Sequence, residues 1–115
     1  MNTLEVLIEA INSRMPISFE YNKEGKEKGK RFGHPYAVYI FTAKNTRIQS
    51  TKVHIVQTGG VSDSKDENPF NSFRQFNLEE LSDVNILKNE KPFGPDLHEN
   101  YKPESDWYKD VIAKV

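Results

Sequence analysis

The sequence predicts a single α+β domain over residues 1–115, with a helix at each end and about five short antiparallel strands between them. Three observations predict this class. Apolar residues near the N-terminus repeat with helical spacing, the middle of the chain alternates apolar and polar residues as strands do, and residues 105–115 return to helical spacing. With 36% hydrophobic residues, the chain can bury one modest core.

The first helix is predicted from Thr3 to Arg14. Asn2 is suited to cap it, and Glu5 is placed to return a hydrogen bond to Asn2 as a capping box. Pro16 ends the helix. Its apolar face is formed by Leu4, Leu7, Ile8 and Ile11.

Three strands are predicted in the first half of the chain. Residues 17–21 alternate as a half-buried strand with its aromatic face inward, and the lysine- and glycine-rich stretch to Gly29 is expected to be a solvated loop. Residues 32–41 are apolar on both faces after Pro35, which predicts a strand covered on both sides. Residues 44–46 indicate a turn, and residues 47–57 the next strand or pair of strand segments.

Residues 58–72 form a loop longer than most connections, and such loops are often functional. Residues 73–76 then predict a short strand. Asn77 is expected to cap a helical turn over residues 78–82, with Glu80 at the capping-box position, and residues 84–87 form the closing strand.

Ser105 is the expected N-cap of the C-terminal helix. The common face of that helix would carry Trp107, Val111, Ile112 and Val115. We expect Trp107 and Tyr108 to dock on the chain's own core, the alternative being contact with a partner.

Several functional classes are not expected. There is no cysteine, so thiolate metal sites and disulfides are excluded. The three histidines lack zinc-ligand spacing, and no nucleophile elbow or phosphate-binding glycine loop occurs, so we expect neither an enzyme nor a cofactor. Residues 63–68 are rich in oxygen ligands, but Lys65 interrupts them and the glycine and final glutamate of an EF-hand are missing, so a flexible loop is expected.

Membrane partners are not expected either. No apolar run approaches the roughly 20 residues that a bilayer requires, and the N-terminus lacks the features of a signal peptide. The predicted location is the cytoplasm.

The net charge of −1 is unevenly distributed. Residues 22–31 contain five basic and two acidic residues, whereas residues 79–110 contain nine acidic residues and four lysines. This asymmetry would orient an anionic partner toward one face, although the overall balance argues against strong nonspecific binding to duplex DNA.

Four segments occur in a characteristic order: Leu7-Ile8-x-Ala10-Ile11 ahead of Ile17-x-Phe19-x-Tyr21, Arg31 ahead of His34-Pro35-Tyr36, Val53 to Gln57 followed by Gly59, Gly60 and Ser62, and Phe73-Arg74-x-Phe76-Asn77-Leu78. Together they resemble the WYL domain over roughly residues 4–93. The Trp-Tyr-Leu tripeptide that names this family is absent, and Val53-His54-Ile55 takes its place. The resemblance implies a small SH3-like or Sm-like antiparallel β-barrel of about five strands, with residues 94–115 as an extension.

The resemblance also implies a ligand-sensing module, often for nucleic acid or nucleotide-like ligands. Carried over by position, Arg31, His54 and Arg74 become the candidate ligand-binding residues, together with Gln57 and Tyr36. Arg74 is expected to face away from both Phe73 and Phe76, where its guanidinium can clamp a phosphate or carboxylate. The alternatives are purely structural: Arg74 paired with Glu79 or Glu80, Arg31 solvated within the lysine-rich run, and His54 hydrogen-bonded inside the protein.

Two functional hypotheses follow. The leading one is a non-enzymatic ligand-binding or regulatory module for an anionic ligand, such as a nucleotide or single-stranded nucleic acid, held by Arg31 and Arg74. The alternative is a protein-interaction or assembly module that docks on a protein partner or forms a homo-oligomer through edge strands and the aromatic C-terminal helix.

Overall fold

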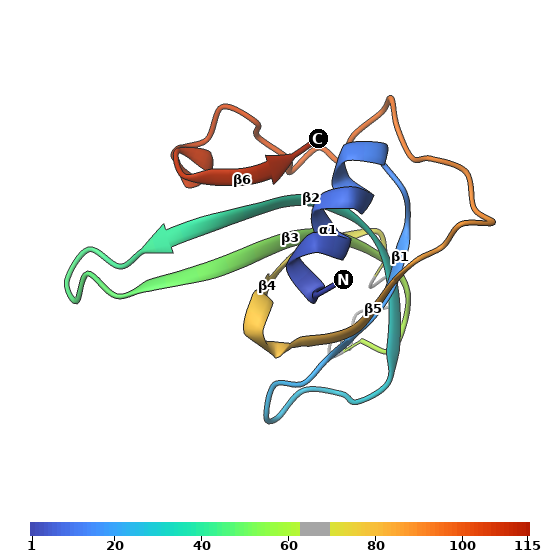
Figure 1. The fold of residues 1–115 in the computed structure, drawn as a ribbon, viewed down its shortest axis with the longest axis horizontal. Coiled ribbons are helices and arrows are strands. Elements are labelled where there is room, and N and C mark those ends of the chain that lie inside the picture. Colours follow the sequence, from blue (N-terminus) through green and yellow to red (C-terminus); the bar gives the residue numbers. More distant parts are fainter. Residues whose placement is uncertain (63–69) are drawn as a thin grey trace.

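One N-terminal helix and a six-stranded antiparallel sheet make up the fold in the computed structural model, which describes residues 1–62 and 70–115 (Figure 1). The helix is α1 (Thr3–Ser13), and two 3₁₀ turns are η1 (Leu78–Glu80) and η2 (Asp106–Tyr108). The strands are β1 (Ile17–Tyr21), β2 (Lys30–Thr42), β3 (Gln49–Gly60), β4 (Ser72–Asn77), β5 (Leu81–Ile86) and β6 (Val111–Lys114). The flexible loop expected at residues 63–68, and its comparison with a calcium loop, lie outside the described residues.

The sheet is open, so the predicted closed barrel is wrong. Its strand order is β4-β3-β2-β1-β5, and β6 pairs with β2. β4 and β5 follow each other in the chain but pair with opposite partners, β3 and β1, because η1 turns the chain between them. Closure would require β4 and β5 to pair with each other, and instead they end the sheet on its two sides.

α1 confirms the helix predicted from the N-terminal periodicity. Its buried residues are Leu7, Ala10 and Ile11. The Asn2 side chain accepts a hydrogen bond from the Glu5 amide at 2.8 Å and the Glu5 carboxylate accepts one from the Asn2 amide at 3.2 Å, so the predicted capping box is present. α1 has 11 residues, and within residues 1–62 and 70–115 no helix is long and apolar enough to cross a membrane.

Two hydrophobic cores lie on opposite faces of the β2–β3 region, which confirms that β2 is covered on both sides. The first lies beneath α1 and includes Phe19, Val38, Val53, Ile55 and Phe76. The second lies beneath the C-terminal segment and consists of Tyr36, Ala37, Tyr39, Val56, Tyr101 and Tyr108. The two cores explain how a short chain buries strands that are apolar on both faces.

The predicted C-terminal helix is wrong. Ser105 does cap a helical turn, since its side chain accepts a hydrogen bond from the Trp107 amide, but that turn is η2 and ends after three residues. The chain then extends as β6 and pairs with β2. β-branched Val111 and Ile112 favour a strand. β1 pairs with only the first part of β2, so the same edge of β2 further along has backbone groups without a partner until β6 pairs with them, and a helix would leave them unpaired.

Candidate functional site

The alternation of side chains along β4 assigns the five candidate residues to two different faces of the sheet. Arg74 is paired in register with Ile55 of the first core, whereas the next residue, Gln75, is paired with His54. Arg31, Gln57 and Arg74 meet on the first face, and Tyr36 and His54 belong to the second. The expectation that Arg74 faces away from Phe76 is wrong, because residues two apart on a strand point the same way.

Gln57 joins the two arginines of the first face. Its side-chain oxygen accepts hydrogen bonds from Arg31 Nη1 at 3.3 Å and from Arg74 Nη1 at 3.1 Å. Its side-chain nitrogen donates to the carbonyl oxygens of Gly59 at 3.1 Å and Val61 at 2.6 Å. Gln57 is fully buried, so these bonds hold the amide in one orientation and present one acceptor to two guanidinium groups.

Arg31 is fully buried, although it follows a lysine-rich loop. Its guanidinium lies 5.8 Å from the ring centre of Tyr21 and 6.0 Å from that of Phe76, within cation–π range of both. Nη2 also donates to the Glu27 carbonyl at 3.2 Å. Because an arginine stays protonated in proteins, this position carries a permanent positive charge inside the sheet.

Arg74 is half-buried and more accessible than Arg31. Its Nη2 donates to the Ser62 hydroxyl at 3.0 Å, and its guanidinium lies 5.9 Å from the ring centre of Phe70. Glu80, considered as a partner from the sequence, instead accepts hydrogen bonds from Tyr21 and Asn77. The predicted capping role of Asn77 is therefore wrong: its side chain donates to Glu80 and makes no cap bond.

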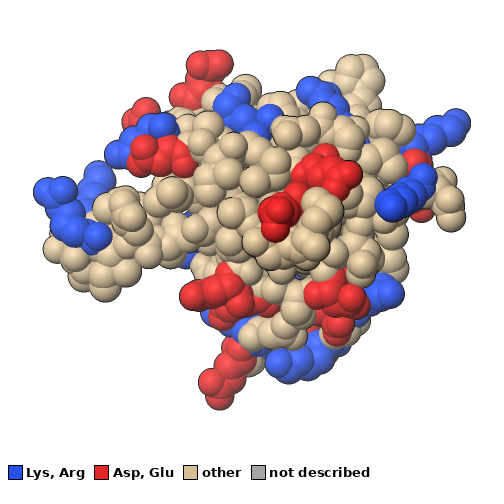
Figure 2. Space-filling model, viewed as in Figure 1, with Lys and Arg blue, Asp and Glu red and all other residues tan. Residues whose placement is uncertain are grey.

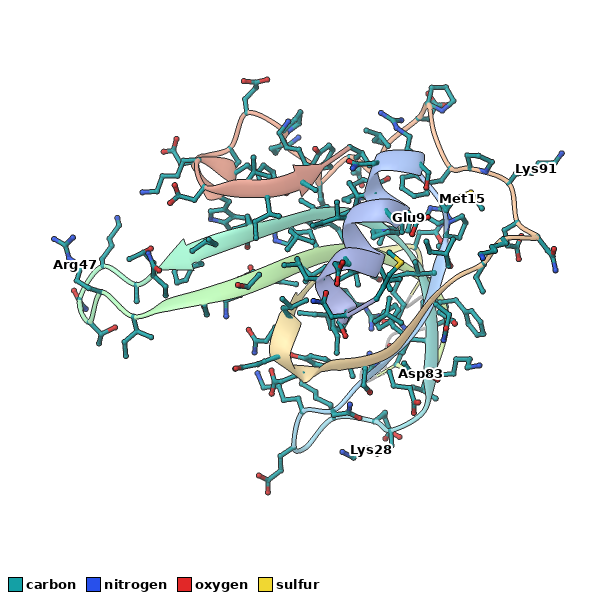
Figure 3. All side chains as sticks on the ribbon, viewed as in Figure 1. Glu9, Met15, Lys28, Arg47, Asp83 and Lys91 are labelled. Atoms are coloured by element: carbon teal, nitrogen blue, oxygen red, sulfur yellow. The ribbon has the colours of Figure 1, made fainter. Side chains whose placement is uncertain are left out.

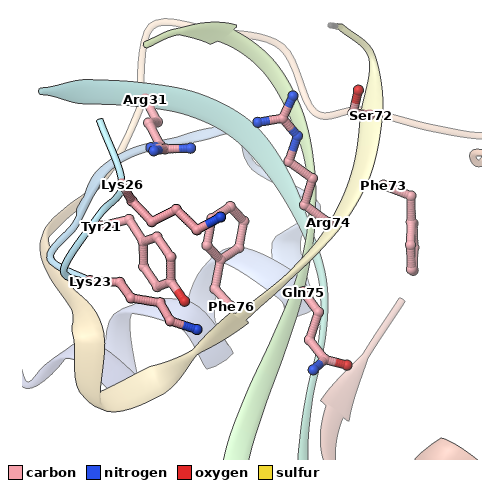
Figure 4. Close-up of a pocket in the computed structure, with 9 residues that line it drawn as sticks. All are labelled: Tyr21, Lys23, Lys26, Arg31, Ser72, Phe73, Arg74, Gln75 and Phe76. Carbon is pink, nitrogen blue, oxygen red and sulfur yellow. The ribbon is translucent and has the colours of Figure 1, made fainter. Parts of the chain in front are cut away.

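A cavity of about 620 Å³ opens beside the two arginines, between β4 and the loop that joins β1 to β2 (Figure 4). Four cationic side chains line it, and none of the described lining residues is acidic. The lining consists of Tyr21, Lys23, Lys26, Arg31, Ser72, Phe73, Arg74, Gln75 and Phe76. We call this cavity the basic pocket.

Lys23 and Lys26 were missed as candidates. The excess of positive charge over residues 22–31 was the available signal, but such runs are usually solvated loops. The structure shows both lysines exposed and extending over the pocket that holds Arg31 and Arg74 (Figure 4). The loop therefore contributes to the site through its position relative to β4, which no local pattern reveals.

His54 lies in a buried chain of hydrogen bonds on the second face. Its Nδ1 is 2.7 Å from the Tyr108 hydroxyl and its Nε2 is 3.2 Å from the Tyr39 hydroxyl, which donates to Gln75 at 2.8 Å. Tyr39 uses its one hydrogen on Gln75, so it accepts from His54 Nε2–H, and Nδ1 accepts from Tyr108. Burial lowers the pKa of His54 from 6.5 to about 4, so the imidazole is neutral near pH 7.

Tyr36 also has structural partners on the second face. Its hydroxyl accepts a hydrogen bond from the His98 amide at 2.9 Å, and its ring stacks on Phe93 with centres 5.6 Å apart. Both contacts tie the segment after β5 to the sheet. Only 3% of Tyr36 is exposed, so the ring offers almost no surface to a ligand in the basic pocket.

No protein-family model matches the chain, and no curated protein matches it. The resemblance to WYL domains therefore stays a prediction. In the part of the chain that the structure describes, no group of three or more histidine and acidic side chains is arranged to hold a metal ion.

Proposed function

We propose that this protein is a non-enzymatic binding module whose anionic ligand, a nucleotide or single-stranded nucleic acid, occupies the basic pocket. The observation that carries the proposal is the convergence of Lys23, Lys26, Arg31 and Arg74 on one cavity whose described lining includes no acidic residue. The predicted cytoplasmic location is part of the proposal, since both ligand classes occur there.

Electrostatics support an anion in this cavity. The charge of Arg31 is permanent and lies in a buried environment, where it is screened less than a surface charge. The two lysines add positive charge at the solvent side. A phosphate that enters between them gains attraction from both directions, and a cavity lined by one sign of charge concentrates counter-ions of the other sign.

The four cations have different roles in the proposal. Arg74 and the two lysines contact the ligand directly, because they are the accessible ones. Arg31 acts from behind Gln57, through its charge and through the bond that fixes the Gln57 amide, which in turn holds the Arg74 guanidinium. Lysine side chains are long and flexible, so they adapt to phosphates in more than one position.

Aromatic rings extend the proposal from a simple anion to a nucleotide. Tyr21, Phe73 and Phe76 line the same cavity as the cations. The Phe73 ring packs against Tyr36 and His54 on the second face, so the rings that a base meets beside the cations are those of Tyr21 and Phe76. A volume of about 620 Å³ falls within the usual range for small-molecule sites.

Fluorescence polarisation with a labelled single-stranded oligonucleotide and a labelled nucleotide, at low and moderate salt, tests the proposal. We expect salt-sensitive binding of the oligonucleotide, with a slope of log K against log salt near −2 for about three phosphate contacts. Arg74→Ala should weaken binding and reduce that slope by about 0.7. Arg31→Ala is unsuitable because Arg31 is fully buried.

Lys91→Ala is the control for Arg74→Ala, since Lys91 is exposed in the loop after β5 (Figure 3). It removes one positive charge away from the basic pocket and should leave the affinity nearly unchanged. Absence of binding at low salt, or equal effects of the two substitutions, would refute the proposal.

The alternative function, a protein-interaction or assembly module, is supported by the open ends of the sheet. Among the strands that the structure describes, β4 and β5 each have a single neighbour, which leaves each with an edge for pairing. Deletion of residues 94–115 does not discriminate between the functions, because Tyr101 and Tyr108 belong to the second core. Light scattering across a concentration series discriminates between the two functions. A stable oligomer that binds no anion would favour the assembly module.

A further inference from the structure

We infer a second nucleic-acid contact site on the face opposite the basic pocket, where Trp107 and Phe41 hold one base of a single strand and a neighbouring group of cations binds the adjacent phosphate. This inference does not rest on the proposed function. Its aromatic and cationic residues are not those of the basic pocket, and Gln75, which borders both cavities, lies on the face of β4 opposite to Arg74.

Trp107 is held in place and yet presents half of its surface. Its ring lies 5.1 Å from the His54 ring, which is buried beneath it, and 52% of the residue remains exposed. The neighbouring Tyr108 is buried and docks on the second core, as the sequence predicts for the pair. Trp107 therefore departs from that expectation and offers a ring of fixed orientation to solvent.

Trp107 and Phe41 border one small cavity of about 270 Å³, which we call the aromatic slot. Tyr39, Lys52 and Gln75 complete its lining. At about 30 Å³ per water molecule the slot has room for roughly nine waters, and a nucleobase has a similar number of heavy atoms. A base that enters meets aromatic surface and the polar ends of Lys52 and Gln75, a combination suited to stacking and to hydrogen bonding.

A second cavity, of about 280 Å³, is lined by residues that follow those of the slot in the sequence. Its lining consists of Thr42, Ala43, Lys44, Arg47 and Lys109. Thr42 follows Phe41 directly, and Lys109 lies two residues after Trp107, so the same two segments contribute to both cavities. The inference places the phosphate at the three cations of this second cavity and its base in the slot.

The charge of the β2–β3 hairpin favours a polyanion as the occupant. From Lys30 to Gly60 the sequence contains five basic residues and no aspartate or glutamate. The hairpin projects from the body of the molecule (Figure 1), its tip is basic on the face shown in Figure 2, and Arg47 lies at that tip (Figure 3). Asp106 and Asp110 flank Lys109 in sequence, but neither lines the two cavities.

A positive aromatic slot selects against other occupants. Lys52 lies 6.0 Å from the ring centre of Phe41 and repels a cationic ligand, which excludes recognition of an ammonium group by an aromatic cage. A neutral apolar peptide would gain nothing from the three cations beside the slot. A base that carries its own phosphate uses both features.

Trp107 is the only tryptophan, so its intrinsic fluorescence reports on the cavities that it lines, of which the slot is one, and Phe41→Ala distinguishes the slot from the other. The experiment is a titration of the full chain with a ten-nucleotide oligo(dT) at low salt, followed by tryptophan emission. An oligomer of the same length with abasic sites retains the phosphates and removes the bases. We expect quenching by oligo(dT), and roughly tenfold weaker binding of the abasic oligomer.

Three variants locate the contact. Phe41→Ala should weaken oligo(dT) binding roughly tenfold and the abasic oligomer far less, while Arg47→Ala should weaken both. Ile48→Ala is the matched control, since it removes an exposed apolar side chain from the same hairpin but from neither cavity. All three residues are exposed, and circular dichroism checks the fold of each variant.

Arg74→Ala separates this inference from the proposed function. Quenching that persists in Arg74→Ala and weakens in Phe41→Ala supports the slot, whatever happens at the basic pocket. No quenching by oligo(dT), quenching unaffected by Phe41→Ala, or quenching lost in Arg74→Ala alone would each overturn the inference.

Discussion

At the scale of single residues, the sequence identifies the chemistry of the candidate site better than its geometry. The order of the segments predicts Arg31, Gln57 and Arg74 as site residues, and the three do meet through the Gln57 amide. The burial of Arg31 was not predictable, because it depends on Tyr21 and Phe76 from two other strands. Local charge pattern describes a residue's neighbours in sequence, whereas burial depends on its neighbours in space.

The neutral state of His54 predicts how stability depends on pH. Its pKa is lowered from 6.5 to about 4 by burial. Between these two pH values, His54 binds a proton in the unfolded chain and stays neutral in the folded chain. The stability from neutral His54 is complete above pH 6.5 and is lost as the pH falls toward about 4. Between about pH 7 and 5 the free energy of unfolding should fall by on the order of 2 kcal/mol.

Urea unfolding of the wild type and of His54→Gln at both pH values measures this effect. The pKa of His34 is also lowered by burial and acts in the same direction, but it is common to both proteins and cancels in the comparison. The variant should show a clearly smaller loss. An equal pH dependence in the two proteins would mean that His54 is not the residue responsible.

At the scale of elements, prediction succeeds where an element's own sequence determines its structure. It fails where a segment pairs with the open edge of a strand that is distant in the sequence. α1 has its periodicity, its cap and its stop within 16 residues, and it forms as expected. The C-terminal segment has helical spacing and a cap at Ser105, yet it becomes η2 and β6. At Ala37 to Tyr39, β2 pairs with β3 along one edge, and β6 supplies the partner for its other edge. The local sequence of the C-terminal segment does not reveal that this edge is open.

Tyr108 connects the C-terminal segment to the sheet, so Tyr108→Phe should destabilise the protein. The substitution removes the hydroxyl that donates to His54 Nδ1 at 2.7 Å and leaves that nitrogen unsatisfied in a buried position. The expected loss in the free energy of unfolding is about 2 kcal/mol. The neighbouring Trp107→Phe alters a ring that is half exposed and should cost less than about 0.5 kcal/mol in the same urea titration. Equal losses in the two variants would show that the hydroxyl makes no net contribution.

At the scale of the whole molecule, the open sheet and the basic pocket have one origin. The strand order of the sheet places β4 at one end, and among the described residues the loop between β1 and β2 borders the space beside β4. A closed barrel would have filled that space with another strand. The sequence predicts the order of strands β1 to β5 along the chain. Closure of a barrel depends on whether β4 and β5 pair with each other, and the path of the chain at η1 separates them.

The same arrangement explains how a protein with a net charge of −1 presents two separate basic surfaces. The acidic residues are concentrated after residue 78, while the hairpin from Lys30 to Gly60 has none. Alternation along β4 then assigns Arg74 to one face and Gln75 to the other. Charge composition alone shows the imbalance, and the sheet determines which cations share a cavity.

Charge reversal at two lysines of one loop tests the central claim most directly. Lys26 lines the basic pocket, whereas Lys28, two residues later in the same exposed loop, does not (Figure 3). Lys26→Glu and Lys28→Glu change the net charge equally. Fluorescence polarisation with a labelled single strand at low salt should show roughly tenfold weaker binding for Lys26→Glu and near wild-type binding for Lys28→Glu. Equal affinities for the two variants would contradict an anion site in this pocket.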